Sequence, residues 1–235
     1  GLDHEVVAPQ PTMPNIVAGF AGGEPGKHLV LNGHLDIFPA GDPTQWSDDP
    51  FSGVARDGKL FGRGVIDMKT GTAASFLTYL YLHEMRQQLG GRLTLTAVSD
   101  EETGGTWGAG YLMDNHPDVI GDCVLNGEPS TPYTIRFGEK GPVWLDMLVR
   151  TPGGHGAYTH LSRSAIQETA EIIGRIERLA DQSVTLPDDI LAAVEAARPE
   201  LDAALGAGAT DVVKQVTVNI GVIRGGVKTN VIAAD

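Results

Sequence analysis

Cysteine is almost absent from this sequence. The 235 residues include a single cysteine, Cys123. The chain therefore forms no intrachain disulfide bond and builds no zinc site from several thiolates. We expect Cys123 to be a small buried residue of a strand. Metal binding, if it occurs, depends on histidine and carboxylate side chains.

Positive charge and long apolar runs are also scarce. The chain has 17 Lys and Arg against 30 Asp and Glu, a formal net charge of -13. This charge disfavours nucleic acid and anionic membranes as partners, because both attract cationic surfaces. No apolar run approaches the roughly 20 residues that span a bilayer, and the first residues lack a signal-peptide pattern. We therefore expect a cytoplasmic protein with neither a nucleic-acid nor a membrane partner.

The first part of the chain alternates between strand-like and helix-like segments. Apolar patterning predicts strands at residues 27–32, 92–98 and 122–125, and helices at 68–89 and near 107–114. Strands that alternate with helices of this length are typical of parallel βαβ units. We therefore predict an α/β domain.

The pattern changes near Gly138. It predicts strands at 143–150, 212–223 and 227–232, a turn at Gly225-Gly226, and helices at 162–179 and 186–205, the last kinked or split by Pro199. This mixture is typical of an α+β layer, so we place a domain boundary after residue 138.

Side chains that can bind a metal ion lie next to several of the apolar runs. The candidates are His34, Asp36, Asp67, Glu101, Glu102 and Glu128. All but Asp67 come just after a predicted strand, and Asp67 comes just before the long helix. Ligands of open α/β sheets gather at the carboxyl ends of the strands, so we expect these side chains to converge. One imidazole with several carboxylates is the composition of a divalent metal centre.

Each candidate also has an ordinary structural explanation. A strand-end histidine is often only hydrogen-bonded to the protein, Asp67 can cap the following helix, and Glu128 can be a turn residue. The combination favours a metal site. In a strand-like His34-x-Asp36 both side chains point to one face, so the carboxylate can hold the imidazole. The three acids Asp100–Glu102 follow a strand predicted to be buried, where a cation would offset the cost of uncompensated charge.

Six motifs make the sequence resemble a known enzyme family. In chain order they are GHLDIFP, WSDDPF, DGKLFGRGVIDMK, SDEE, NGEPS and GGHGAYTH. From about Lys27 to its end, the chain resembles the di-zinc amidohydrolase family of acetylornithine deacetylase, succinyl-diaminopimelate desuccinylase, aminoacylase and carboxypeptidase G. The resemblance implies a hydrolase that cleaves the amide bond of an N-acyl amino acid or small peptide through a zinc-activated water. A dipeptidase or a carboxypeptidase of the same family is the alternative.

The resemblance also implies a fold. The family has an α/β catalytic domain, with a mixed, largely parallel sheet and helices on both faces, and an inserted α+β lid that mediates homodimerisation. Residues 1–138 then form the N-terminal part of the catalytic domain, and residues 139–235 form an incomplete lid.

The resemblance assigns two zinc ions, which cobalt or manganese could replace, to four residues. These implied ligands are His34, Asp67, Glu102 and Glu128. His34 and Glu128 bind one ion, Glu102 binds the other, and Asp67 bridges them.

Other roles implied by the resemblance concern catalysis and substrate binding. Glu101 is the general base, Asp36 supports His34, and His155 reaches the active site from a loop of the lid. Asn230 is a candidate for binding the substrate carboxylate. The resemblance further implies a cis peptide bond between Asp67 and Met68.

The sequence departs from the family pattern in three respects. The family has one more zinc-ligand histidine near the end of a longer chain, and no stretch after Val212 provides it. We therefore expect an inactive fragment that lacks the C-terminal part. A chain that truly ends at residue 235 would instead be a non-catalytic metal-binding or dimerisation module. Phe38 and Thr159 replace the valine and proline that are frequent in relatives, so the substrate stays open.

Overall fold

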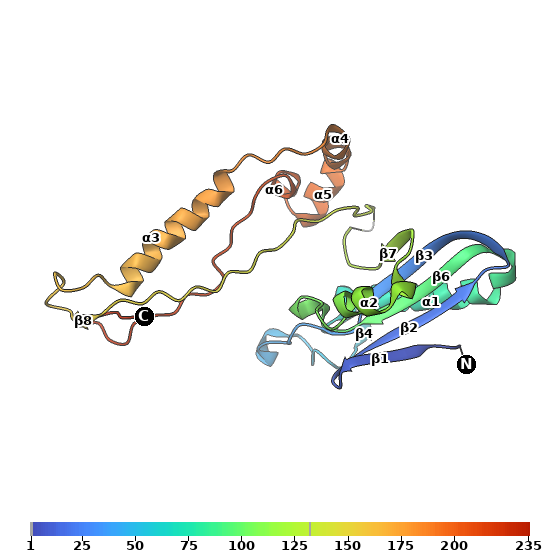
Figure 1. Ribbon diagram of the computed structural model, residues 1–235, viewed down its shortest axis with the longest axis horizontal. Coiled ribbons are helices and arrows are strands. Elements are labelled where there is room, and N and C mark those ends of the chain that lie inside the picture. The colour runs from blue at the N-terminus through green and yellow to red at the C-terminus, as the bar shows by residue number, and fades with distance from the viewer. Residues whose placement is uncertain (1, 132) are drawn as a thin grey trace. The chain divides into compact units, whose positions relative to one another are not determined.

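The chain forms two compact units. The computed structural model describes residues 2–131 and 133–235. Contacts divide the chain into a first unit, Gly1–Pro129, and a second unit, Ser130–Asp235 (Figure 1). This division comes earlier in the chain than the boundary at 138 that the sequence suggests.

A five-stranded mixed sheet forms the centre of the first unit. Its strands, in spatial order, are β1 (Glu5–Gln10), β2 (Met13–Ala21), β6 (Gly90–Val98), β3 (Glu24–His34) and β7 (Cys123–Asn126). The last three are parallel to one another. The strand β2 runs antiparallel to both of its neighbours, β1 and β6. The predicted strands correspond to β3, β6 and β7. The sequence patterning did not reveal β1 and β2, which contain prolines and alternate weakly.

Helices cover both faces of this sheet. The helix α1 (Thr70–Glu84) contributes Tyr79 to an apolar cluster with Leu93 and Leu95 of β6. The helix α2 (Ala109–Asn115) contributes Leu112 to a second cluster with Val98. Successive strand residues point to opposite faces, so the odd-numbered leucines and Val98 lie on different sides of β6.

Cys123 is exposed, contrary to our expectation, because β7 is an edge strand whose residues are all exposed.

A small hairpin of β4 (Ala55–Arg56) and β5 (Lys59–Leu60) lies in the connection between β3 and α1.

Most of the regular secondary structure in the second unit is helical, and long irregular segments connect the helices. Its helices are α3 (Ala165–Glu177), α4 (Asp188–Ala196), α5 (Arg198–Leu205) and α6 (Ala209–Val213). Pro199 lies in the first turn of α5 and separates it from α4, as predicted. Among the described residues of this unit, one short ladder pairs β8 (Gly154–His155) with β9 (Val231–Ile232).

Two strand predictions in the second unit are wrong, and a third is right only in part. Residues 143–150 form no strand, residues 212–223 begin in α6 and continue irregularly, and Val231–Ile232 of the prediction at 227–232 forms β9. A strand requires a hydrogen-bonded neighbour, and residues 143–150 and 212–223 pair with no strand among the described residues. No helix in the described part of the chain is both long and apolar enough to cross a membrane.

Candidate metal centre

The imidazole of His34 lies at the centre of a group of carboxylates. His34 ends β3 and is 2% exposed. Its Nε2 lies 2.9 Å from Asp67 Oδ1, 3.2 Å from Glu128 Oε1 and 3.8 Å from Glu101 Oε2. Its Nδ1 is 2.9 Å from the carbonyl oxygen of Asp36, to which it can only donate. In the neutral ring Nε2 then keeps its lone pair and faces the carboxylates, as a metal-ligating histidine does.

Asp67 is anchored by its neighbours in sequence. It lies in the helical turn Val65–Lys69 that precedes α1, and the Asp67–Met68 peptide bond is cis, as the resemblance implies. The fully buried Met68 accepts the backbone N–H of His34 on its sulfur at 3.2 Å. Thr72 Oγ1 donates to the carbonyl oxygen of His34 at 3.0 Å. Sequence reasoning missed both supporting residues, because neither stands in a recognisable ligand spacing.

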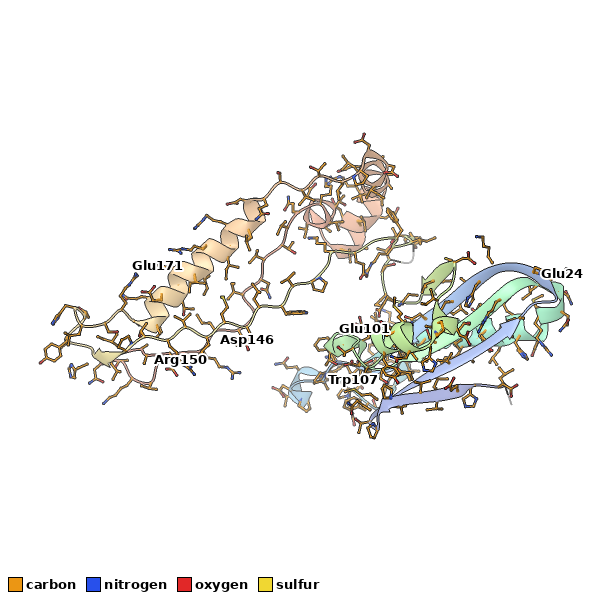
Figure 2. All side chains as sticks on the ribbon, in the orientation of Figure 1. Glu24, Glu101, Trp107, Asp146, Arg150 and Glu171 are labelled. Carbon is orange, nitrogen blue, oxygen red and sulfur yellow. The ribbon has the colours of Figure 1, made fainter. Side chains whose placement is uncertain are left out.

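The acidic turn Glu101–Thr103 follows β6, and Figure 2 labels Glu101 and Trp107 of this connection. The Asp36 carboxylate accepts the backbone N–H of Glu101 at 3.2 Å and that of Glu102 at 3.0 Å. Phe38 donates its backbone N–H to Glu102 Oε1 at 3.2 Å. The Asp36 carboxylate therefore holds the acidic turn, and it lies 3.5 Å from His34 Nδ1, farther than the Asp36 carbonyl.

Asp100 has a different role from the one its sequence position suggests. Its carboxylate accepts the backbone N–H of Trp107 at 2.8 Å and the hydroxyl of Thr103. These hydrogen bonds compensate the buried carboxylate, so Asp100 needs no cation.

Glu128 brings a buried oxygen without a hydrogen bond into the group. Its backbone N–H donates to Asn126 Oδ1 at 2.7 Å, which fixes the turn after β7. Glu128 Oε1 is buried and has no hydrogen-bond partner among the described residues. Burial raises the pKa of Glu128, His34 opposes this shift, and the negative charges of Asp67 and Glu101 add to it. A cation at this position would satisfy the oxygen.

The remaining electrostatics also describe a site with excess negative charge. Burial lowers the pKa of His34, but the hydrogen bond to Asp67 and the charge of Glu128 outweigh it, so the pKa lies above its ordinary value. Burial raises the pKa of Glu102, and the charge of Asp67 raises it further.

Two overlapping sets of atoms are close enough to share a metal ion. One atom each of His34, Asp67 and Glu102 lie within 4.8 Å of one another, and so do one atom each of His34, Glu101 and Glu128. A nitrogen with several carboxylate oxygens fits a borderline divalent ion such as zinc.

His155 and Asn230 belong to the second unit. His155 lies in β8, a two-residue strand, where we expected a loop, and its Nδ1 accepts the backbone N–H of Ala157 at 3.1 Å. The ladder pairs His155 with Val231, and the carbonyl oxygen of Asn230 accepts the N–H of Gly156 at 2.8 Å. The two residues are thus neighbours. The separation of His155 from the metal ligands of its own chain stays a prediction.

Comparison with known proteins agrees with the motifs. Residues 30–232 match the family described as Peptidase family M20/M25/M40. The chain belongs to this family. Succinyl-diaminopimelate desuccinylase of Nitrosomonas europaea is 36% identical over 161 residues, which cover 66% of this chain and 43% of the relative. The enzyme of that name from Wolbachia pipientis wMel is 30% identical over 184 residues, 75% of this chain and 46% of the relative. The M20 chain therefore spans less than half the length of these curated relatives.

Solved structures share the fold. An M20 family metallo-carboxypeptidase from Sulfolobus solfataricus matches all of the chain and 60% of its own length, with a TM-score of 0.67 and 18% identity. Human carnosine dipeptidase 1 matches 98% of the chain and 58% of its own length, with a TM-score of 0.58 and 16% identity. Because the sequence identities are only 18% and 16%, these two matches show a shared fold and nothing more.

Proposed function

We propose that this M20 protein is a metal-dependent hydrolase that cleaves the amide bond of an N-acyl amino acid or small peptide. The observation that carries the proposal is the imidazole of His34, whose Nε2 faces Asp67, Glu101 and Glu128. The buried oxygen of Glu128, which accepts no hydrogen bond from the described residues, supports a cation at this place. Membership of the peptidase family and the names of the relatives support amide hydrolysis.

The proposed ligands hold two zinc ions, with cobalt or manganese as substitutes. His34 and Glu128 would hold one ion, Glu102 would hold the other, and Asp67 would contribute to both. A bound zinc would supply a Lewis acid that makes water more acidic and polarises a carbonyl group.

The proposed catalytic residues move and orient protons. Glu101 accepts a proton from the attacking water and returns it to the leaving amine. Asp36 keeps Glu101 and Glu102 in place through their backbone N–H groups. His155 donates a hydrogen bond to the oxygen that becomes negative during the attack.

The second unit is proposed as the inserted lid and as the surface of a homodimer. Asn230 lies next to His155 there and is proposed to bind the substrate carboxylate. We place the protein in the cytoplasm. The similar proteins include a desuccinylase, a carboxypeptidase and a dipeptidase, and all three reactions cleave an amide bond.

A substrate panel tests the proposed reaction. N-succinyl and N-acetyl amino acids and dipeptides are incubated with the full-length protein, first after metal removal and then with zinc restored. We expect zinc-dependent release of an amine from at least one class. Absence of turnover from every class, with zinc bound, would favour the non-catalytic metal-binding module.

Zinc titration of the 235-residue chain tests the ligand assignment. His34, Asp67 and Glu128 give one position three protein ligands, the number typical of a catalytic zinc site. The second position has only Glu102 and the shared Asp67. Calorimetry should therefore detect one tight zinc and at most one weak zinc, with slight or no hydrolysis. Two equally tight sites would show that another residue completes the second position.

A further inference from the structure

A fully buried asparagine in β2 binds both ends of the loop that carries the two glutamates. We call residues 99–107 the acidic loop. Asn15 is 0% exposed. Its Oδ1 accepts the backbone N–H of Ser99 at 2.9 Å, and its Nδ2 donates to the carbonyl oxygens of Trp107 at 2.9 Å and of Val7 at 3.2 Å. A backbone N–H only donates and a carbonyl oxygen only accepts, so these partners fix the orientation of the amide.

Further hydrogen bonds hold the acidic loop, one to the strand β2 and others within the loop itself. Ser99 Oγ donates to the carbonyl oxygen of Pro14, next to Asn15, at 2.6 Å. Asp100 has a φ of 71° and accepts the N–H of Trp107 on its carboxylate and that of Gly105 on its carbonyl oxygen. Both ends of the loop are therefore tied to the sheet through the side chain of Asn15.

The chemistry of the site explains why the acidic loop requires such an attachment. The Glu101 side chain is 52% exposed, so packing alone does not hold it. The loop brings Glu102 within 4.8 Å of Asp67 and Glu101 within 4.8 Å of Glu128. These negatively charged carboxylates repel one another. An apolar residue would suit a buried strand position better than asparagine. The polar side chain is therefore explained by its bonds to the loop.

We propose that Asn15 is a positioning residue that sets the place of the general base Glu101 and of the ligand Glu102. Asn15 acts through the backbone of Ser99 and Trp107, to which its side chain is hydrogen-bonded. This inference rests on the proposed function of the same site.

The variant Asn15→Ala in the full-length protein tests the inference. Removal of residues that orient a metal site typically lowers metal affinity or activity about 10- to 100-fold. We expect kcat to fall by about this factor with a much smaller change in KM. Hydrogen exchange of residues 99–107 should accelerate, and calorimetry should show weaker zinc binding.

Thr94→Val is the matched control. Thr94 is also 0% exposed in the same sheet, and its Oγ1 lies 2.8 Å from His28 Nε2, remote from the acidic loop. This control should lower stability while it leaves kcat, zinc binding and exchange of the acidic loop unchanged. A folded Asn15→Ala protein that matches Thr94→Val in all three measurements would overturn the proposal.

A milder variant covers the case in which Asn15→Ala does not fold. Asn15→Asp keeps the side-chain oxygen that accepts the N–H of Ser99 and removes only the donation from Nδ2 to Trp107 and Val7. The same three measurements should change in the same direction by a smaller factor, and unchanged values would overturn the proposal. If the wild-type protein hydrolyses no amide, the proposed function fails, and zinc affinity together with hydrogen exchange still decides the role of Asn15.

Discussion

At the scale of single residues, the adjacent Glu101 and Glu102 have different surroundings. The Glu102 carboxylate accepts the N–H of Phe38, and burial raises its pKa. Glu101 Oε2 lies 3.8 Å from His34 Nε2, and its side chain is about half exposed. The hydrogen-bonded carboxylate of Glu102 suits a metal ligand, and the more accessible carboxylate of Glu101 suits proton transfer.

Substitution of these two residues should separate catalysis from metal binding. In the full-length protein, Glu101→Gln should lower kcat about 100- to 10,000-fold, the usual contribution of a general base, and zinc affinity should change little. Glu102→Gln should weaken zinc binding. Steady-state kinetics and calorimetry of both variants give the comparison. A Glu101→Gln protein with near-normal kcat would assign the base to another residue.

The sequence indicated which candidate side chains lie together better than it indicated what supports them. The convergence of His34, Glu101 and Glu128 could be predicted because each follows an apolar run that forms a parallel strand, and parallel strands end at one edge. Asn15 and Met68 have no such signal. A single buried asparagine within β2 is visible only once its partners, 84 and 92 residues away in the chain, are known.

At the scale of elements, a close backbone contact sets the start of α1 against the turn after β7. A Cβ atom on Gly71 would lie 1.9 Å from the carbonyl oxygen of Gly127, a backbone atom that cannot move alone. This contact brings the segment after Asp67 to the segment before Glu128. Two glycines thus allow the two segments that carry the candidate ligands Asp67 and Glu128 to meet.

Gly71→Ala should therefore disturb both stability and metal binding. Overpacking of this kind costs about 1–3 kcal/mol, and displacement of the Gly127 turn should weaken zinc binding through Glu128. Denaturant unfolding and zinc titration measure the two effects. Gly174→Ala in α3 is the control, because nothing lies within 4 Å of its added Cβ. It should stabilise by about 0.4–1 kcal/mol. Equal behaviour of the two variants would disprove the role of the contact.

Ion pairs join α4, α5 and the end of α6. Arg198 lies 2.8 Å from Glu195 and 2.8 Å from Asp211, and Lys214 pairs with both acids. The hydrogen bond to Arg198 and then that to Lys214 lower the pKa of Glu195 to about 2. The same two partners hold the pKa of Asp211 well below its usual range.

The stability of this helical cluster should fall in acid. A glutamate with a lowered folded pKa stabilises fully above its unfolded pKa of about 4.3, and the effect is lost as the pH falls toward about 2. Glu195→Gln should therefore destabilise the protein at pH 6 more than at pH 3, as followed by urea unfolding. Glu200→Gln, a change at an acid of α5 without an ion pair to the described residues, should lower the free energy of unfolding at pH 6 less than Glu195→Gln does. A pH-independent effect of Glu195→Gln would contradict the argument.

At the scale of the whole molecule, the sequence predicted the first unit well and the second unit poorly. In the first unit, β3 pairs with both β6 and β7, so patterning and pairing agree. In the second unit, residues 143–150 keep the composition of a strand. Figure 2 labels Asp146 and Arg150 along this stretch, which forms no strand with the described residues. Alternation reveals which segments suit a sheet, but it does not reveal whether a neighbour is present to pair with.

This stretch provides the test of the proposed homodimer. Trp144 is 90% exposed, and Val143, Leu145, Met147 and Leu148 are also exposed. An unpaired extended segment with apolar side chains is a template for pairing with another chain, and tryptophan often dominates interface energetics. Trp144→Glu in the full-length protein should weaken the dimer at least about tenfold, or 1.4 kcal/mol, as measured by sedimentation equilibrium. Val6→Glu, an apolar-to-acidic change at a 59% exposed site in β1, should leave the dimer intact. A monomeric wild type would exclude the homodimer, and an unchanged Trp144→Glu dimer would place its interface elsewhere.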